Sequence, residues 1–149
     1  MKLNTKSGEV IKSDTYCGTT SYNPPEVLKH IPYDPFKGDI WCLGVMLFIM
    51  LNQEYPFDRH DGKDLMYEKQ MTRQYQMSED IDRKCSECVK DLIRVMLEPD
   101  AKKRPDIFKV CTHPWFPLIL REAELLGLVP IVTALPGSST NLSGQHRGQ

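Results

Sequence analysis

The sequence predicts a mainly α-helical fold, and three features carry that prediction. Between residues 86 and 97 the apolar side chains recur every three or four positions, which is the spacing that buries one face of a helix. Residues 38–53 are apolar on almost every face, so a helix there is expected at the centre of the domain. Hardly any segment shows the alternation of apolar and polar side chains that is typical of strands.

The elements before the central helix are short because prolines interrupt the chain. Pro24 and Pro25 open a short predicted helix, since the first helical turn does not need the N–H that proline lacks. Glu26 lies in the same turn, where the positive end of the helix dipole favours a negative charge. Residues 30–38 contain two prolines and are predicted to be a connection to the central helix.

Further helical segments follow the central helix. Residues 65–75 are a weaker candidate, and residues 86–97 are a stronger one. A short helix is predicted over residues 105–110 and a last helical segment over residues 113–127, each after a proline. Past Pro136 the sequence is polar and rich in glycine and serine, which predicts a disordered tail.

Size and charge limit the classes of function. A chain of 149 residues fits one domain, and its net charge of −1 gives no reason to expect nucleic acid or a membrane surface as a partner. The N-terminus lacks the apolar core of a signal peptide. The longest apolar run, residues 40–51, is shorter than the roughly 20 residues that span a bilayer. The five cysteines, an odd number, favour reduced thiols, so we expect a cytoplasmic protein.

Four stretches of sequence, taken in order, carry a family resemblance. They are "TYCGTTSYNPPE" from residue 15, "DIWCLG" from residue 39, "YPFD" from residue 55 and "RVMLEPDAKKRPDIFKVCTHPWF" from residue 94. Together they resemble the C-terminal lobe of a eukaryotic Ser/Thr protein kinase, from the activation segment onward. The wording "DIWCLGVMLFIM" is most similar to the testis-specific serine kinase family.

This resemblance implies a domain organisation. Residues 13–117 would form the helical C-terminal lobe of the kinase fold, as a partial kinase domain. Residues 1–12 would be a loop preceding the activation segment. Residues 118–149 would be a C-terminal extension with a disordered tail.

The resemblance also assigns structural roles to five residues. Glu26 and Arg104 match the buried ion pair that pins the activation segment in this family. Asp39 matches the aspartate that accepts N–H bonds from the catalytic loop, and Trp41 and Gly44 match positions of the rigid core. Without the resemblance, Glu26 and Arg104 would be interpreted as surface charges and Asp39 as an acid at a helix N-terminus.

The hydroxyl-rich stretch before the first helix matches the part of a kinase that holds the substrate peptide. Thr15 matches the position of the activating phosphorylation, with Ser13 as a rival acceptor. Thr19 matches the threonine that favours Ser or Thr over Tyr substrates, and we expect Thr19 and Tyr22 to contact the peptide. Pro24 stands where the family prefers alanine, which puts the peptide preference in doubt.

In a full-length protein, the resemblance implies transfer of the ATP γ-phosphate to Ser or Thr of a protein substrate, with magnesium, under an upstream activating kinase. The sequence contains none of the motifs of that chemistry, which are the Gly-rich loop, Val-Ala-x-Lys, His-Arg-Asp and Asp-Phe-Gly. We therefore expect that the β lobe and catalytic loop are absent, that no catalytic residue is present, and that the chain alone uses no ATP or magnesium.

Two other classes of protein remain as alternatives. In the first alternative, the chain would be a truncated, non-catalytic module that grips kinase partners or substrates, with apolar surface exposed where another lobe would pack. Alternatively it is an unrelated helical adaptor, in which Glu26 and Arg104 would not meet.

Two further patterns are open to a functional interpretation. Cys85 and Cys88, with Cys111 and His113 downstream, have the spacing of a zinc site. Because the first two extend the apolar stripe of residues 86–97, core packing is preferred and no metal is expected. The apolar residues 125–135 either dock a partner or pack back on the lobe, and the sequence does not decide between these.

Overall fold

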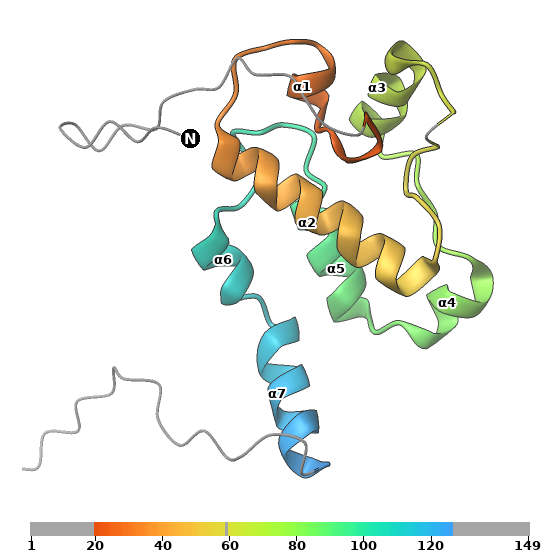
Figure 1. Ribbon diagram of the computed structural model, residues 1–149. Coiled ribbons are helices and arrows are strands. Elements are labelled where there is room, and N and C mark those ends of the chain that lie inside the picture. Colours follow the sequence, from red (N-terminus) through yellow and green to blue (C-terminus); the bar gives the residue numbers. More distant parts are fainter. Residues whose placement is uncertain (1–19, 59, 127–149) are drawn as a thin grey trace, which may run out of the picture. The chain divides into compact units, whose positions relative to one another are not determined.

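The computed structural model describes residues 20–58 and 60–126, without the side chains of residues 123 and 124. Within them, the short 3-10 helix η1 (Thr20–Tyr22) is followed by seven α-helices (Figure 1). These are α1 (Pro25–Leu28), α2 (Pro35–Asn52), α3 (Lys63–Met71), α4 (Glu79–Lys84), α5 (Glu87–Met96), α6 (Ile107–Cys111) and α7 (Trp115–Leu125). The prediction of a mainly helical fold is confirmed.

The chain divides into two compact units, Met1–Phe116 and Pro117–Gln149. Each of η1 to α6 lies in the first unit, together with the first two residues of α7. The first unit therefore contains every described residue that the sequence singles out as functional.

The central helix α2 begins earlier than predicted. Asp34 caps its N-terminus by accepting a hydrogen bond from the N–H of Phe36 at 2.9 Å, and Pro35 takes the first helical position. Residues 35–37 were therefore wrongly predicted as connection, since Pro35 starts the helix instead of interrupting it. At the other end, Gln53 adopts a left-handed conformation (φ 59°) and donates its N–H to the carbonyl of Ile49 at 2.8 Å.

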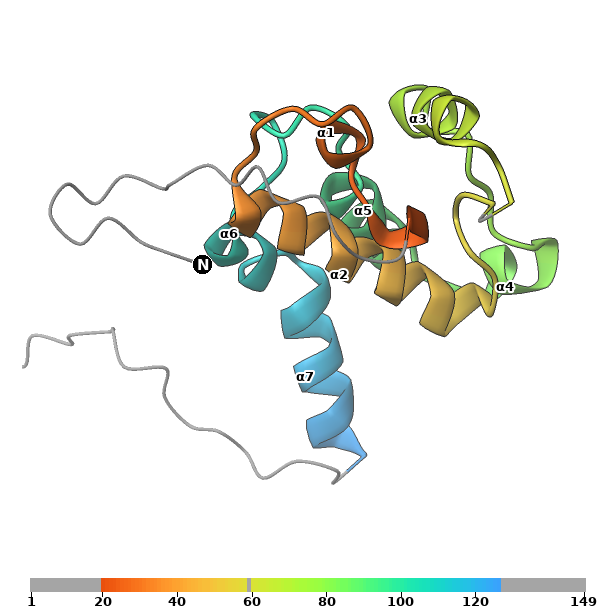
Figure 2. The ribbon, with the colours of Figure 1, turned by 45° about the horizontal axis from the view of Figure 1, so that its top comes forward.

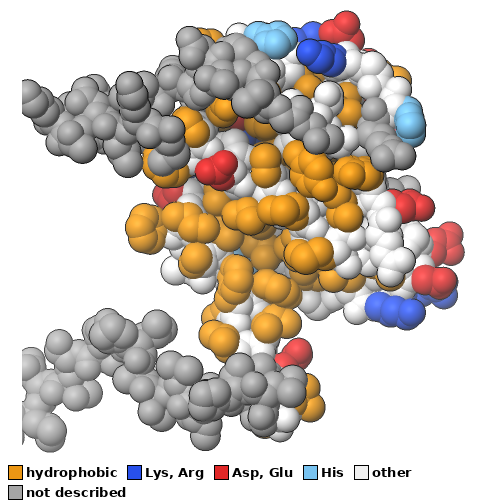
Figure 3. Space-filling model, in the orientation of Figure 1, with side chains coloured by type: hydrophobic (Ala, Val, Ile, Leu, Met, Phe, Trp, Pro, Cys, Tyr) orange, Lys and Arg blue, Asp and Glu red, His pale blue; other side chains and the backbone are white. Residues whose placement is uncertain are grey.

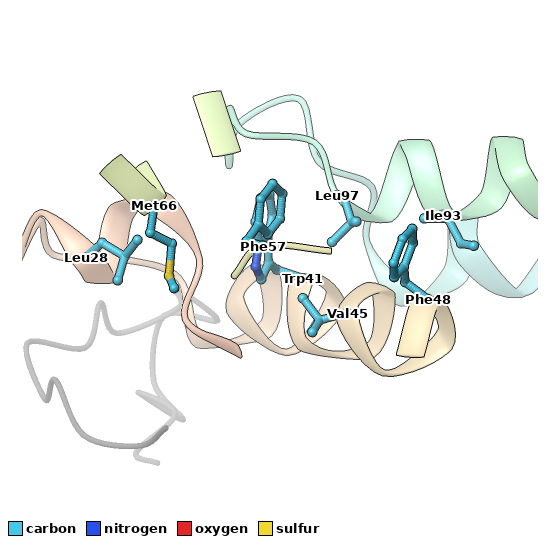
Figure 4. Close-up of a cluster of buried hydrophobic side chains, with 8 residues drawn as sticks. All are labelled: Leu28, Trp41, Val45, Phe48, Phe57, Met66, Ile93 and Leu97. Atoms are coloured by element: carbon cyan, nitrogen blue, oxygen red, sulfur yellow. The ribbon is translucent and has the colours of Figure 1, made fainter. Parts of the chain in front are cut away.

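One face of α2 packs into the main hydrophobic core. Trp41, Val45 and Phe48 on this face are completely buried. The Trp41 and Phe57 rings are stacked with centroids 5.8 Å apart (Figure 4). The cluster brings together side chains from four of the helices and the loop after α2, namely Leu28, Trp41, Val45, Phe48, Phe57, Met66, Ile93 and Leu97.

Helix α5 packs directly against α2 (Figures 1 and 2). At Gly44 the backbones approach so closely that an added Cβ would lie 2.9 Å from Cβ of Met96 and 3.0 Å from Cδ2 of Leu97. A second buried cluster lies beside this contact and joins α2 and α5 to α6, through Ile40, Leu92, Met96 and Val110. The close contact explains why a glycine is needed in the middle of a helix that otherwise favours larger side chains.

The opposite face of α2 is exposed among the described residues. Phe36, Leu43, Met46 and Met50 recur along it and are between 39% and 72% exposed. Figure 3 shows apolar side chains gathered over this part of the molecule. The expectation of a helix buried on almost every face is thus correct for one side of α2 and wrong for the other.

By length and composition alone, α2 is the one described helix that could cross a membrane. The same composition is typical of the core helix of a water-soluble domain. Trp41, Val45 and Phe48 are completely buried, so packing accounts for the apolar residues on this face of α2.

The stripe of α5 is shorter than predicted. Ser86 caps this helix by accepting a hydrogen bond from the N–H of Val89 at 3.3 Å, and Cys85 lies outside it, at the end of α4. Cys85 and Cys88 are half-buried, whereas the fully buried stripe consists of Val89, Leu92, Ile93 and Met96. Cys85 therefore does not extend the stripe, because the chain turns between the two helices.

Candidate functional site

Glu26 and Arg104 meet in a two-pronged ion pair. Arg104 Nη1 lies 2.8 Å from Glu26 Oε1, and Nη2 lies 3.0 Å from Oε2. The Arg104 side chain is completely buried and that of Glu26 is 10% exposed. Glu26 is in the first turn of α1, so the pair fixes this short helix to the loop that follows α5.

The remaining donors of Arg104 are also satisfied. Its Nε donates to the carbonyl of Glu98 at 2.8 Å, and Nη1 donates to that of Lys37 at 2.8 Å. In return, Lys37 Nζ donates to the Arg104 carbonyl at 2.5 Å. The guanidinium lies over the Trp41 ring, 5.0 Å from its centroid. A buried charge is tolerated here because all three guanidinium nitrogens donate hydrogen bonds, Nη2 also to the carbonyl of Pro99 at 3.5 Å.

The segment before α1 is held from two sides. Cys42 on α2 donates its thiol hydrogen to the carbonyl of Tyr22, with Sγ and O 3.3 Å apart. Burial raises the pKa of the Cys42 thiol, which keeps it protonated and able to donate. On the other side, Gln70 on α3 donates from Nε2 to the carbonyl of Asn23 at 3.0 Å. The backbone of Tyr22 and Asn23 is therefore fixed between α2 and α3.

The Tyr22 side chain extends toward the loop after α2. Its ring meets that of Tyr55 edge to face, with centroids 5.9 Å apart. A hydrogen bond with the Tyr55 hydroxyl raises the pKa of Tyr22. Tyr22 is half-buried and Tyr55 is 36% exposed, so the pair presents one side to solvent.

The core residues predicted from the resemblance occupy different surroundings. Trp41 and Gly44 lie on the buried face of α2, one under Arg104 and the other against α5. Asp39 is exposed, and with Phe36 and Leu43 it lines an apolar groove of about 500 Å³. The structure thus separates Asp39 from the other two, on the uncovered side of the helix.

The phosphorylation and substrate threonines are not all described. Thr15, its rival Ser13, and Thr19 lie outside the described residues, so their predicted roles stay predictions. Of the two predicted peptide contacts, Tyr22 alone is described.

Sequence reasoning missed three residues that support this site. Gln70 and Lys37 contribute long-range hydrogen bonds to Asn23 and Arg104, and Tyr55 contacts Tyr22. Tyr55 starts the "YPFD" stretch, which was the one available signal. Nothing in the spacing of Gln70 distinguishes it from an exposed helical residue.

The described residues include no cluster of side chains that fits a bound metal ion. No group of three or more His, Cys, Asp or Glu side chains able to hold a metal occurs in the described part of the chain. His113, one member of the zinc-like pattern, instead lies 3.1 Å from Asp91 through Nε2 and accepts the N–H of Trp115 at Nδ1.

Comparisons with known proteins identify sequences that are similar to this chain. The family profile described as "Protein kinase domain" matches residues 2–116. Testis-specific serine/threonine-protein kinase 3 of Mus musculus and of Homo sapiens are each 41% identical over 103 residues, which are 69% of this chain and 37% of the relative. Testis-specific serine/threonine-protein kinase 1 of Homo sapiens is 35% identical over 147 residues, covering 91% of this chain and 39% of the relative. The chain thus spans less than two fifths of the length of these relatives.

Proposed function

The chain belongs to the protein kinase domain family, in the branch of the testis-specific serine/threonine kinases, and we propose that it forms the part of such a kinase that holds the substrate peptide. In this proposal residues 15–26 are the end of the activation segment. Tyr22, together with Thr19, contacts the peptide that carries the acceptor Ser or Thr.

The fixed position of the 20–26 segment is the observation that carries this proposal. The ion pair with Arg104 holds Glu26, the thiol of Cys42 holds the carbonyl of Tyr22, and the amide of Gln70 holds that of Asn23. A peptide-binding surface gains affinity when it is ordered before the ligand arrives, because no further ordering cost is incurred on binding. Three separate partners on such a short segment supply that order.

In a full-length kinase the reaction would be transfer of the ATP γ-phosphate to the hydroxyl of a protein Ser or Thr. Magnesium-ATP would supply the phosphoryl group and the charge neutralisation. The residues of this chain would bind the peptide, set its direction along the 15–26 segment, and keep it still. We propose that catalytic groups come from other parts of the kinase fold.

In this proposal the kinase is regulated by phosphorylation of Thr15, with Ser13 as the alternative acceptor. A phosphate adds about −1.5 to −2 charges and three acceptor oxygens, and it orders a loop when arginines are near. An upstream kinase would then be a partner of this chain. The proposal also retains a cytoplasmic location, in keeping with the free thiols of Cys42, Cys85, Cys88 and Cys111.

One observation favours the second candidate, a non-catalytic binding module. The exposed apolar face of α2 continues onto α6, where Ile107 and Phe108 are 47% and 80% exposed. Surfaces of this kind bind other polypeptides. In such a module the chain would grip a kinase partner or a substrate without any phosphoryl transfer.

Two titrations of the 149-residue chain, followed by ¹H–¹⁵N NMR, test the proposed function. A serine-containing peptide is expected to shift the signals of Tyr22 and Asn23 in a saturable way and to leave those of α4 unchanged. Magnesium-ATP is expected to shift no signal in a saturable way. Peptide shifts confined to α2 and α6 would favour the binding module, and micromolar binding of magnesium-ATP would overturn the assignment of the catalytic groups to other parts of the fold.

A further inference from the structure

Two neighbouring hollows lie beside α1. The first, of about 280 Å³, is bounded by Tyr67 and Met71 of α3. The second, of about 510 Å³, reaches the start of α2 and Lys102. The two hollows share four lining residues, which are Glu26, Ile31, Asp100 and Ala101. They therefore form one groove, the α1 groove, where the loop between α5 and α6 passes beside α1 (Figures 1 and 2).

The turn that ends α1 presents Ile31 to solvent between the two hollows. His30 has a left-handed conformation (φ 53°) and donates its N–H to the carbonyl of Val27 at 3.1 Å. The N–H of Ile31 is bonded in turn to the carbonyl of Glu26 at 2.9 Å. In such helix endings an apolar residue at the position of Ile31 often packs against the residue that its N–H bonds. Here that residue is a carboxylate paired with Arg104, and Ile31 remains 52% exposed on a fixed backbone.

The charged side chains along the α1 groove are engaged, with one exception. The carboxylates each accept a hydrogen bond from the chain itself, namely those of Glu26, Asp34 and Asp100. Lys37 Nζ donates to the carbonyl of Arg104 at 2.5 Å. Lys102 is exposed, and its ammonium group forms no ion pair with any carboxylate of the described residues. The groove therefore offers apolar surface and one cation that is available to a ligand.

We propose that the α1 groove binds an extended segment of another protein that carries two apolar side chains and a neighbouring carboxylate. Side chains two positions apart in an extended chain point to the same side, so they enter the two hollows with Ile31 between them. The carboxylate pairs with Lys102. The inference goes beyond the proposed function, because the groove shares no lining residue with the pair of Tyr22 and Tyr55 and needs no acceptor serine or threonine.

The test uses the complete 149-residue chain and fluorescein-labelled peptides without serine, threonine or tyrosine, in a polarisation assay. The first peptide has two leucines separated by one residue, with two glutamates on each side. A second has glutamines in place of the glutamates, and it is expected to bind about 1.5- to 5-fold more weakly, the effect of one exposed ion pair. A third has alanines in place of the leucines and should bind at least about 10-fold more weakly, because the leucines supply most of the buried apolar surface.

Two pairs of variants locate the binding site. Ile31→Ala is expected to weaken the leucine–glutamate peptide about 3- to 10-fold, whereas Met50→Ala, which truncates an exposed apolar side chain on α2, should not weaken it. Lys102→Glu should reverse the charge preference, so that a peptide with lysines in place of the glutamates binds more tightly than the original. Lys84→Glu changes the charge of an exposed lysine on α4 and should leave the original order.

Three results would overturn the inference. They are equal binding of the glutamate and lysine peptides by the wild-type protein, equal effects of Ile31→Ala and Met50→Ala, and a dimer in sedimentation that Ile31→Ala breaks, since a second copy would then occupy the groove. Each of these leaves the proposed function standing, because the serine peptide of that proposal is expected to bind at Tyr22. Conversely, binding of the leucine–glutamate peptide without any binding of the serine peptide would support the inference while the proposed function fails.

Discussion

Arg104 and Glu26 are 78 positions apart in the sequence, and they meet in an ion pair that leaves the arginine side chain no exposed surface. The pair joins the start of α1 to the loop after α5, across the central helix. The position of the 20–26 segment therefore depends on a contact made far from it in sequence.

Replacing Glu26 with alanine is expected to lower the free energy of unfolding by about 3–5 kcal/mol, because Arg104 then stays charged and buried without a counter-charge. Urea denaturation followed by circular dichroism measures this loss. Asp64→Ala is the matched control: it breaks the exposed ion pair with Lys29 and should cost much less, because exposed ion pairs add little to stability. Equal losses in the two variants would mean that burial does not make the first pair special.

Replacing both partners should cost less than replacing Glu26 alone. In the variant with Glu26→Leu and Arg104→Met no buried charge is left, and apolar contacts with Trp41 take the place of the pair. The same denaturation experiment compares the double variant with Glu26→Ala. A double variant less stable than the single one would show that the carbonyl bonds of Arg104 matter more than its charge.

Gly44→Ala should destabilise the fold, although alanine is the better helix former by about 1 kcal/mol. The new methyl group would overlap Met96 near its backbone, and such overpacking typically costs about 1–3 kcal/mol. Gly62→Ala is the control, since nothing lies within 4 Å of an added Cβ there. Thermal unfolding compares the two, and a Gly44→Ala protein as stable as wild type would refute the close contact between α2 and α5.

The caps of α4 and α5 make an internal comparison. Ser86 accepts the N–H of Val89, whereas Ser78 makes no capping hydrogen bond with its side chain. Ser86→Ala is therefore expected to cost about 0.5–2 kcal/mol, and Ser78→Ala clearly less. Urea denaturation of the two variants measures both losses in free energy of unfolding, provided that the dependence on denaturant concentration is the same for both. A larger effect at Ser78 would contradict the cap assignment.

Cys42 should react with iodoacetamide more slowly than Cys111. Burial raises the pKa of the Cys42 thiol, so less of it is the reactive thiolate at mildly alkaline pH, and its hydrogen is bonded to the Tyr22 carbonyl. Cys111 is exposed. Peptide mass spectrometry after timed alkylation gives both rates. Faster modification of Cys42 would mean that the 20–23 segment leaves α2 readily.

The same shift gives a pH dependence of stability. The pKa of the Cys42 thiol is higher in the folded chain than in the unfolded one, so the unfolded chain releases this proton first as the pH rises. The stability that the protonated Cys42 thiol contributes is therefore present below the unfolded-state pKa of about 8.5. It is lost as the pH rises above that value. Denaturation at several pH values should show a steeper decline for wild type than for Cys42→Ala.

Motif order was sufficient to predict the main fold, but charge and capping signals were needed for the rest. The sequence stretch that forms α4 has no apolar stripe, so periodicity did not reveal it. Its acidic first turn (Glu79, Asp80 and Asp82) and basic last turn (Arg83 and Lys84) were the available signal. The start of α2 was missed for a related reason, because Asp34 and Pro35 act as cap and first residue rather than as a break.

The candidate site was predictable where a motif fixes the partner and not where a polar side chain is buried. Glu26 and Arg104 could be paired in advance since both belong to the family pattern. Gln70 could not, because its burial follows from how α3 lies against the segment before α1. The contact between Tyr22 and Tyr55 likewise depends on the path of the loop after α2, which apolar periodicity does not specify.

The activity of a chimeric kinase would show whether this chain forms a working peptide platform. Residues 2–116 of this chain would replace the matching segment of testis-specific serine/threonine-protein kinase 3, the 41% identical relative. We expect that the folded chimera transfers phosphate from magnesium-ATP to a serine peptide, and that a Glu26→Ala change in it lowers this activity. A folded chimera that binds magnesium-ATP as the host kinase does, yet phosphorylates no serine or threonine peptide, would contradict the claim that this chain supplies a working peptide platform.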